Sequence, residues 1–108
     1  MDVQLPSIIS ELIIAQNNQN STAYTNCFTE TAIVKDEGNT YRGKTEIWNW
    51  IEAANNTVQP MMKALTYKGS DKECVLSAEV SGNFPGSPVV LEYYHTIEND
   101  LINTLRIE

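Results

Sequence analysis

The sequence predicts an α+β domain in which helix patterns gather in the first half of the chain and strand patterns in the second. Apolar residues recur every three to four positions in stretches up to Asn56, and after Pro60 their period changes to two. Helices followed by antiparallel strands pack as layers, with the helices on one face of the sheet. The length of 108 residues suits one domain, over residues 1–108.

Three helix patterns precede Pro60. The first covers residues 8–16 and ends in a run of polar residues. A second, shorter helix follows, with Tyr24, Cys27 and Phe28 along one side. The third covers residues 44–56, where apolar residues again share one face. We therefore expect three helices in the layer that covers the sheet.

The strand patterns are short and separated by turn residues. A β-branched run over residues 31–36 ends at a turn at 37–39. Four further strands are predicted over residues 62–68, 73–83, 89–98 and 101–107, with turns at 69–71, 82–86 and 99–100. One face of the run 89–98 carries Val89, Leu91, Tyr93, His95 and Ile97, and the opposite face carries Val90, Glu92, Tyr94 and Thr96.

Charge narrows the classes of partner. The chain has 14 acidic and 7 basic side chains, a net charge of −7, and its basic residues are scattered. Nucleic acids and anionic membranes both attract a basic face, so neither is expected as a partner. No basic residue precedes Lys35 and no apolar run is long enough to span a bilayer, which together favour a cytoplasmic protein.

Motifs for common cofactors and metals are missing. Cys27 and Cys74 have no CxxC spacing and no neighbouring His, so no metal site is expected. The two cysteines are interpreted as free thiols, with a single disulfide as the open alternative. No nucleotide-binding, zinc-protease, serine-hydrolase or calcium motif occurs, and we expect no cofactor.

The order of elements, and two local motifs, resemble a known family. The stretch from Phe28 through Ala32 to Asp36 and Gly38, followed by Tyr41–Ile47, is similar to an F-x-x-x-A-x-x-x-D signature of the nuclear transport factor 2-like superfamily. The hairpin at residues 97–102 is also similar to that family. The resemblance covers essentially the whole chain and includes SnoaL-like polyketide cyclases and ketosteroid isomerase-like enzymes.

This resemblance implies a cone-shaped, cystatin-like α+β roll, in which three helices pack into a curved antiparallel sheet around an apolar cavity. It implies a small hydrophobic molecule as ligand and a homodimer formed through the outer face of the sheet. Val90 and Tyr94, with Glu79 and Glu92 around them, are the residues expected on that outer face.

Three residues are candidates for catalysis. By the resemblance, Asp36 occupies the position where isomerase-like members keep a general base, although Asp also simply begins many turns. Tyr93 occupies the position of a hydrogen-bond donor to the substrate oxygen. His95 shares its strand face and is either a third catalytic group or a packing residue. Leu12 stands where those enzymes have a tyrosine, which argues against steroid isomerisation itself.

Two functions follow from these expectations. One is a cofactor-independent isomerase or cyclase that moves a proton next to a carbonyl group. The other is a non-catalytic, dimeric ligand-binding or accessory domain of the same fold. In both, the ligand pocket is expected to be lined by Leu12, Phe28, Trp50, Met62, Leu91, Ile97 and Leu105.

Overall fold

Helices and strands form largely where the sequence predicts them. The computed structural model describes residues 3–70 and 73–108, so Asp71 of the predicted turn at 69–71 lies outside the described residues. The helices are α1 (Ser7–Asn17), α2 (Ser21–Thr25) and α3 (Gly43–Thr57). The strands are β1 (Phe28–Asp36), β2 (Asn39–Arg42), β3 (Met61–Lys68), β4 (Cys74–Ser81), β5 (Val89–Glu98) and β6 (Leu101–Ile107).

The second helix is shorter than predicted. Asn20 caps its start, because the Asn20 side chain accepts a hydrogen bond from the backbone N–H of Ala23 at 3.0 Å. The helix ends at Thr25, and Phe28 begins β1 instead of lying on the helix. Phe28 pairs with Ile102 of β6 in the sheet, so strand pairing determines its conformation.

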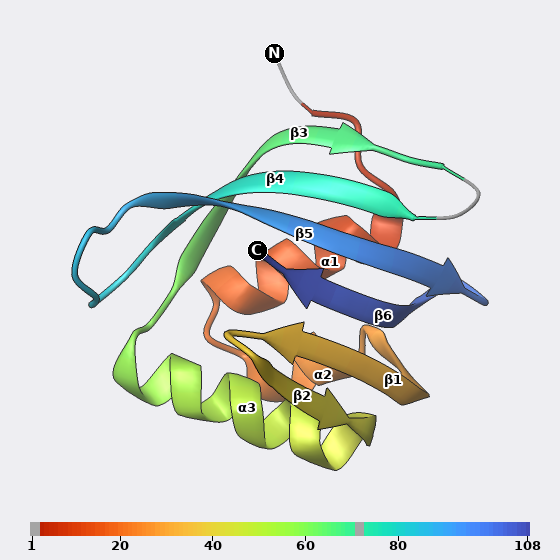
Figure 1. Cartoon of the computed structure of the whole chain (residues 1–108), viewed down its shortest axis with the longest axis horizontal. Coiled ribbons are helices and arrows are strands. Elements are labelled where there is room, and N and C mark those ends of the chain that lie inside the picture. Colours follow the sequence, from red (N-terminus) through yellow and green to blue (C-terminus); the bar gives the residue numbers. More distant parts are fainter. Residues whose placement is uncertain (1–2, 71–72) are drawn as a thin grey trace.

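The strands form a curved sheet in the order β2-β1-β6-β5-β4-β3 within the described part of the chain (Figure 1). Four of its five pairings are antiparallel, and β1 and β6 run parallel. The sheet is therefore mixed where the sequence predicts an antiparallel one. The last strand of the chain lies in the interior of the sheet, between β1 and β5.

The helices cover the concave face of the sheet and form the core with it. In Figure 1, the sheet curls over α1, while α3 runs alongside β1 and β2. The inward residues of β4 are Leu76, Ala78 and Val80, all buried, as their spacing predicts. The described residues contain no helix with the length and apolar character needed to cross a membrane.

Candidate functional site

A cavity of about 440 Å³ lies between the inner face of the sheet and α3. Most of its wall is apolar and comes from α3, β3, β5, β6 and the loop between β4 and β5. Its polar lining consists of Gln16, Tyr24, Asp36, Glu37 and Tyr93, together with the indole of Trp50. Of the described residues that line it, none is a Lys, Arg or His.

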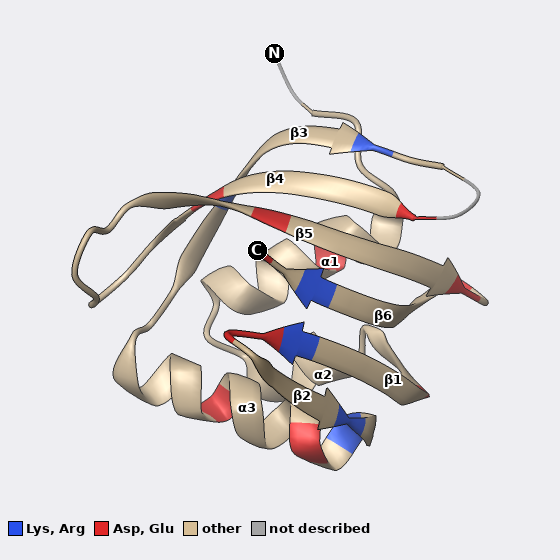
Figure 2. Ribbon diagram, viewed as in Figure 1, with Lys and Arg blue, Asp and Glu red and all other residues tan. Residues whose placement is uncertain are grey.

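Asp36 is held at the cavity by a tight hairpin. It is the last residue of β1 and pairs with Asn39 across the two-residue turn Glu37-Gly38. Both turn residues have positive φ angles, 51° and 79°, as tight hairpin turns require. Figure 2 shows this acidic turn at the end of β1, whereas Lys and Arg are spread over several elements. The hairpin thus fixes the backbone that carries the carboxylate.

Strand register brings Asp36 and Tyr93 onto one row of the sheet. Asp36 pairs with Ile107, and Ile107 pairs with Tyr93. Two strand spacings separate the Cα atoms of Asp36 and Tyr93 by about 10 Å. Both residues line the cavity, so their side chains lie on neighbouring parts of the same wall.

Trp50 orients the carboxylate of Asp36. Its indole Nε1 donates a hydrogen bond to Asp36 Oδ2 at 3.3 Å, and Tyr41 stacks on the indole with ring centroids 5.5 Å apart. Burial raises the pKa of Asp36 above its ordinary value, and the charge of Glu37 adds to this rise. The hydrogen bond from Trp50 lowers the pKa of Asp36, but burial prevails.

Two buried tyrosines face the same cavity. Burial, followed by the charge of Asp36, raises the pKa of Tyr93, and burial also raises the pKa of Tyr24. Both phenols are therefore protonated at neutral pH. Within residues 3–70 and 73–108, neither hydroxyl has a hydrogen-bond partner, and neither is sealed from the cavity. Both remain available as donors to a ligand.

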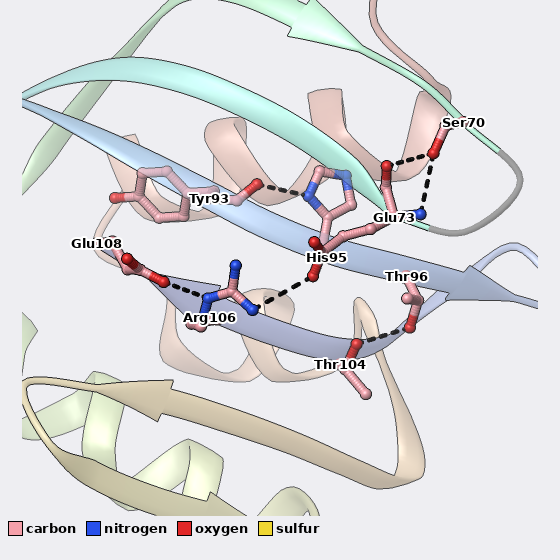
Figure 3. Close-up of polar contacts among 8 residues, drawn as sticks. All are labelled: Ser70, Glu73, Tyr93, His95, Thr96, Thr104, Arg106 and Glu108. Atoms are coloured by element: carbon pink, nitrogen blue, oxygen red, sulfur yellow. Dashed lines mark hydrogen bonds and ion pairs between the residues drawn. The ribbon is translucent and has the colours of Figure 1, made fainter.

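His95 does not line this cavity, and of its two expected roles the structure favours the packing residue over the catalytic group. Its Nδ1 bonds to the Tyr93 carbonyl oxygen at 2.9 Å, and its Nε2 bonds to the Tyr67 hydroxyl at 3.0 Å. Figure 3 shows the imidazole and the Tyr93 ring extending in different directions from β5. Because a carbonyl oxygen only accepts, Nδ1 carries the proton and neutral Nε2 accepts from Tyr67. Burial lowers the pKa of His95, which favours this neutral form.

Only some of the residues predicted to line the pocket do so. Trp50, Met62 and Leu91 line the cavity. Four others do not. Leu12, Phe28 and Leu105 are buried in the core, and Ile97 is 36% exposed beyond an irregularity in the β5–β6 pairing. Alternation along a strand assigns a residue to a face of the sheet but not to a depth. Leu12, Phe28 and Leu105 belong to the hydrophobic core, where side chains fill the space.

Three polar lining residues were not predicted as site residues from the sequence: Gln16, Tyr24 and Glu37, the last of which was expected only to form a turn. Tyr24 fits the apolar spacing of a core residue, and it is also in edge-to-face contact with Trp50, with centroids 6.1 Å apart. Gln16 stands at the polar end of the first helix pattern, where a solvent-facing residue is expected, but it is buried at the cavity. The only feature of the sequence that could have indicated the cavity position of Gln16 is its place at the end of an apolar helix pattern.

Comparison with known proteins identifies the family. The chain is 33% identical to a proposed polyketide cyclase from Sinorhizobium meliloti, with a TM-score of 0.91 over 96% of this chain and 95% of that one. The chain belongs to the nuclear transport factor 2-like superfamily. No family model matches the sequence, and a search of curated proteins finds no match.

More distant members of the superfamily share the fold alone. A cystatin-fold protein from Novosphingobium aromaticivorans is 17% identical, with a TM-score of 0.79 over 94% of this chain and 95% of that one. A ketosteroid isomerase-like protein from Catenulispora acidiphila, crystallised with trimethylamine, is 15% identical, with a TM-score of 0.86 over 97% and 86% of the chains. The predicted roll of helices in a curved sheet is thus confirmed.

Proposed function

We propose that this domain binds a small, largely apolar carbonyl compound and moves a proton next to its carbonyl group without a cofactor. The observation that carries the proposal is the half-buried Asp36 carboxylate, which shares one cavity with the protonated phenols of Tyr93 and Tyr24. A base with a raised pKa beside neutral donors is the pairing that enolisation needs.

The proposed reaction has two proton-transfer steps. The Asp36 carboxylate accepts a proton from the carbon next to the carbonyl. The electron pair of the C–H bond becomes the C=C bond of the enolate as the π pair of the C=O bond moves onto the oxygen. The hydroxyls of Tyr93 and Tyr24 donate hydrogen bonds to the resulting enolate oxygen. Asp36 then returns its proton to carbon, at the same or a conjugated position, and the product leaves with no net change in protons.

The donor set of this site differs from the one that the resemblance implies. Leu12, which stands in place of the expected tyrosine on the first helix, is buried in the core and offers no donor. Tyr24 of α2 is the second phenol at the cavity. The similarity to a proposed polyketide cyclase supports cyclase-type or isomerase-type chemistry, in which an enolate also forms.

The alternative is a domain that binds a ligand without catalysis. The mostly apolar wall favours it, because such a wall holds a hydrophobic molecule without any reaction. The position of His95 outside the cavity also removes one of the three predicted catalytic groups. The two functions differ in whether a bound ketone exchanges its protons.

Proton exchange into 2-tetralone tests the proposal. The bicyclic ketone is incubated with the protein in deuterated water, and loss of its α-proton signals is followed by NMR. We expect catalysed exchange in the wild type and a fall of roughly 10²-fold or more in Asp36→Asn. Asp100→Asn, the same change at an exposed turn, is the control and keeps the wild-type rate. Equal rates in the folded wild type and Asp36→Asn would favour binding alone.

We further propose that the outer face of the sheet forms a homodimer. Val90 projects from this face with 57% of its surface exposed, and Tyr94 lies four residues further along β5 on the same face. Arg106 lies over the Tyr94 ring at 4.4 Å and also pairs with Glu73 and Glu108 (Figure 3). Aromatic residues and arginine are enriched at protein interfaces, and the pairing of Tyr94 with Arg106 therefore supports this proposal.

A further inference from the structure

Gln16 presents an unused hydrogen-bond acceptor to the cavity. It lies near the end of α1 and is only 4% exposed. Its Nε2 donates to Asn55 Oδ1 at 2.9 Å and to the Pro60 carbonyl oxygen at 3.2 Å. Its Oε1 accepts no bond from residues 3–70 or 73–108, yet it is not sealed off. Gln16 lines the cavity, and Oε1 is the atom of its amide that the described part of the chain leaves unbonded for a ligand.

A chain of hydrogen bonds fixes which end of the Gln16 amide faces the cavity. The Glu52 carboxylate only accepts, so the Ser21 hydroxyl donates to it, at 2.5 Å. Ser21 Oγ must then accept from Asn55 Nδ2, at 2.8 Å. This bond leaves Asn55 Oδ1 as the acceptor for Gln16 Nε2. The direction of every bond therefore follows from one carboxylate.

The Pro60 carbonyl oxygen gives the same answer independently. A carbonyl oxygen cannot donate, so the atom of Gln16 that bonds to Pro60 must be the nitrogen. Turning the amide over would place an oxygen against two acceptors, Asn55 Oδ1 and the Pro60 oxygen. Gln16 Oε1 is thus held in place as an acceptor, and a flip that put the NH₂ donor in its position would cost two hydrogen bonds.

We infer that Gln16 makes the cavity selective for a neutral ketone that carries a hydroxyl or N–H group apart from its carbonyl. The inference rests on the proposed function for the carbonyl itself, which Tyr93 and Tyr24 bind. The second polar group of the ligand donates to Gln16 Oε1, on α1, whereas Asp36 acts from β1. The two acids and the absence of Lys, Arg and His among the described lining residues disfavour an anionic ligand.

An acceptor in an apolar cavity discriminates strongly between ligands. When a ligand displaces water, Gln16 Oε1 loses its hydrogen bond unless the ligand supplies a donor. A hydroxyl restores the bond. A methoxy group of similar size places a second acceptor against the oxygen and leaves both without a donor. The preference between the two therefore measures the role of this one atom.

Calorimetric titration with 6-hydroxy-2-tetralone and 6-methoxy-2-tetralone tests the inference. The titrations use Asp36→Asn, in which proton transfer is removed, so binding is measured without turnover. We expect the hydroxy compound to bind roughly tenfold more tightly than the methoxy compound. Adding Gln16→Met should reduce this preference to about twofold or less. Adding Gln4→Met, the same change at an exposed residue outside the cavity lining, should leave the ratio unaltered.

The outcomes separate this inference from the proposed function. Equal binding of the two compounds, or a preference that survives in Gln16→Met, would overturn the inference even where the wild type exchanges protons. A clear hydroxyl preference without proton exchange in the wild type would uphold it and overturn catalysis alone. If Gln16→Met does not fold, Ser21→Ala releases the amide instead. The double variant Asp36→Asn/Ser21→Ala should prefer the hydroxy compound less strongly than Asp36→Asn alone does. An unchanged preference counts against the inference.

Discussion

The carboxylate of Asp36 lies in the wall of the cavity, where burial disfavours its ionised form. Because the pKa of Asp36 is higher in the folded protein than the ordinary 3.8, the folded state holds this proton more tightly than the unfolded chain does. The free energy of unfolding therefore falls as the pH rises from 3.8 through the pKa of the folded state. The residue proposed for proton transfer thus weakens the fold at neutral pH.

Replacing Asp36 by Asn should stabilise the protein above that pH window. The Asn oxygen still accepts the hydrogen bond from Trp50 Nε1, and the buried charge is gone. We expect Asp36→Asn to melt above the wild type at pH 7, with a smaller difference at pH 3. Thermal unfolding by circular dichroism at the two values checks this. A melting temperature below that of the wild type at pH 7 would contradict the assigned burial of the carboxylate.

His95 should make the protein sensitive to acid while leaving its chemistry alone. Since burial lowers the pKa of His95 below 6.5, its contribution to stability is complete above pH 6.5 and is lost as the pH falls through the lower pKa of the folded state. The non-titrating variant His95→Gln should flatten this loss in urea unfolding between pH 7 and 5. It should also lose about 1–3 kcal/mol at pH 8, because the Tyr67 and Tyr93 bonds are disturbed.

The exchange rate into 2-tetralone checks the second half of this prediction. Since His95 lies outside the cavity, the rate in folded His95→Gln should stay within about threefold of the wild type. A loss as large as that in Asp36→Asn would return His95 to the reaction.

The contrast between Asp36 and His95 shows which features of the site a local sequence pattern can predict. A turn after a β-branched run correctly indicated where Asp36 would lie, because two-residue hairpins follow from a few residues. His95 shares a strand face with Tyr93, but the cavity ends between them, and only packing determines that boundary. Gln16 and Tyr24 come from helices, whose contact with the cavity depends on how each helix docks, so no spacing in the sequence predicted their roles.

At the level of elements, the loop between β4 and β5 is fixed to the end of α3 by a close backbone contact. The Asn83 N–H donates to the Val58 carbonyl oxygen at 2.7 Å. A Cβ added at Gly82 would lie 2.7 Å from the same oxygen, so only glycine fits there. Val58 and Phe84 line the cavity, and this contact therefore positions part of its wall.

Gly82→Ala should displace the loop and weaken ligand binding together. We expect a loss of about 1–3 kcal/mol in the free energy of unfolding, because backbone atoms must shift to relieve the contact. The Kd for 6-hydroxy-2-tetralone should rise in the same variant. Gly69→Ala is the matched control: its added Cβ would meet a Tyr67 ring carbon at 3.8 Å, an ordinary contact, so both quantities should stay near wild type. Equal stability of both variants would contradict the close approach.

Most elements were predictable because their patterns are local. The helix expected over residues 44–56 forms as α3, and the last two strand patterns form as β5 and β6 with unchanged bounds. The start of β1 was not predictable, since Phe28 continues the helical spacing of its neighbours and only its pairing with Ile102 makes it a strand residue. The parallel partner of β1 also lies some seventy residues away, beyond any local pattern.

At the level of the whole molecule, the proposed dimer predicts a specific monomerising change. Sedimentation should give the wild type a mass of twice 12.1 kDa, and Val90→Lys should give the monomer mass. Ile14→Lys is the control, because Ile14 is 60% exposed on α1, away from the outer sheet face, and its replacement should leave the dimer intact. A monomeric wild type would exclude this use of the outer face.

Because β6 lies inside the sheet, the sheet cannot be completed until this late segment of the chain has been synthesised. Residues 101–107 separate the pair β1 and β2 from the sheet of β3, β4 and β5. Until that segment has emerged from the ribosome, the two parts have no shared strand, and Asp36 and Tyr93 have no common row. A nascent chain that stalls before residue 101 therefore exposes two apolar half-sheets with unpaired edges, which is the form that chaperones and proteases recognise. The proposed ligand binding requires this strand to be in place, because Asp36 and Tyr93 share a row of the sheet only through β6.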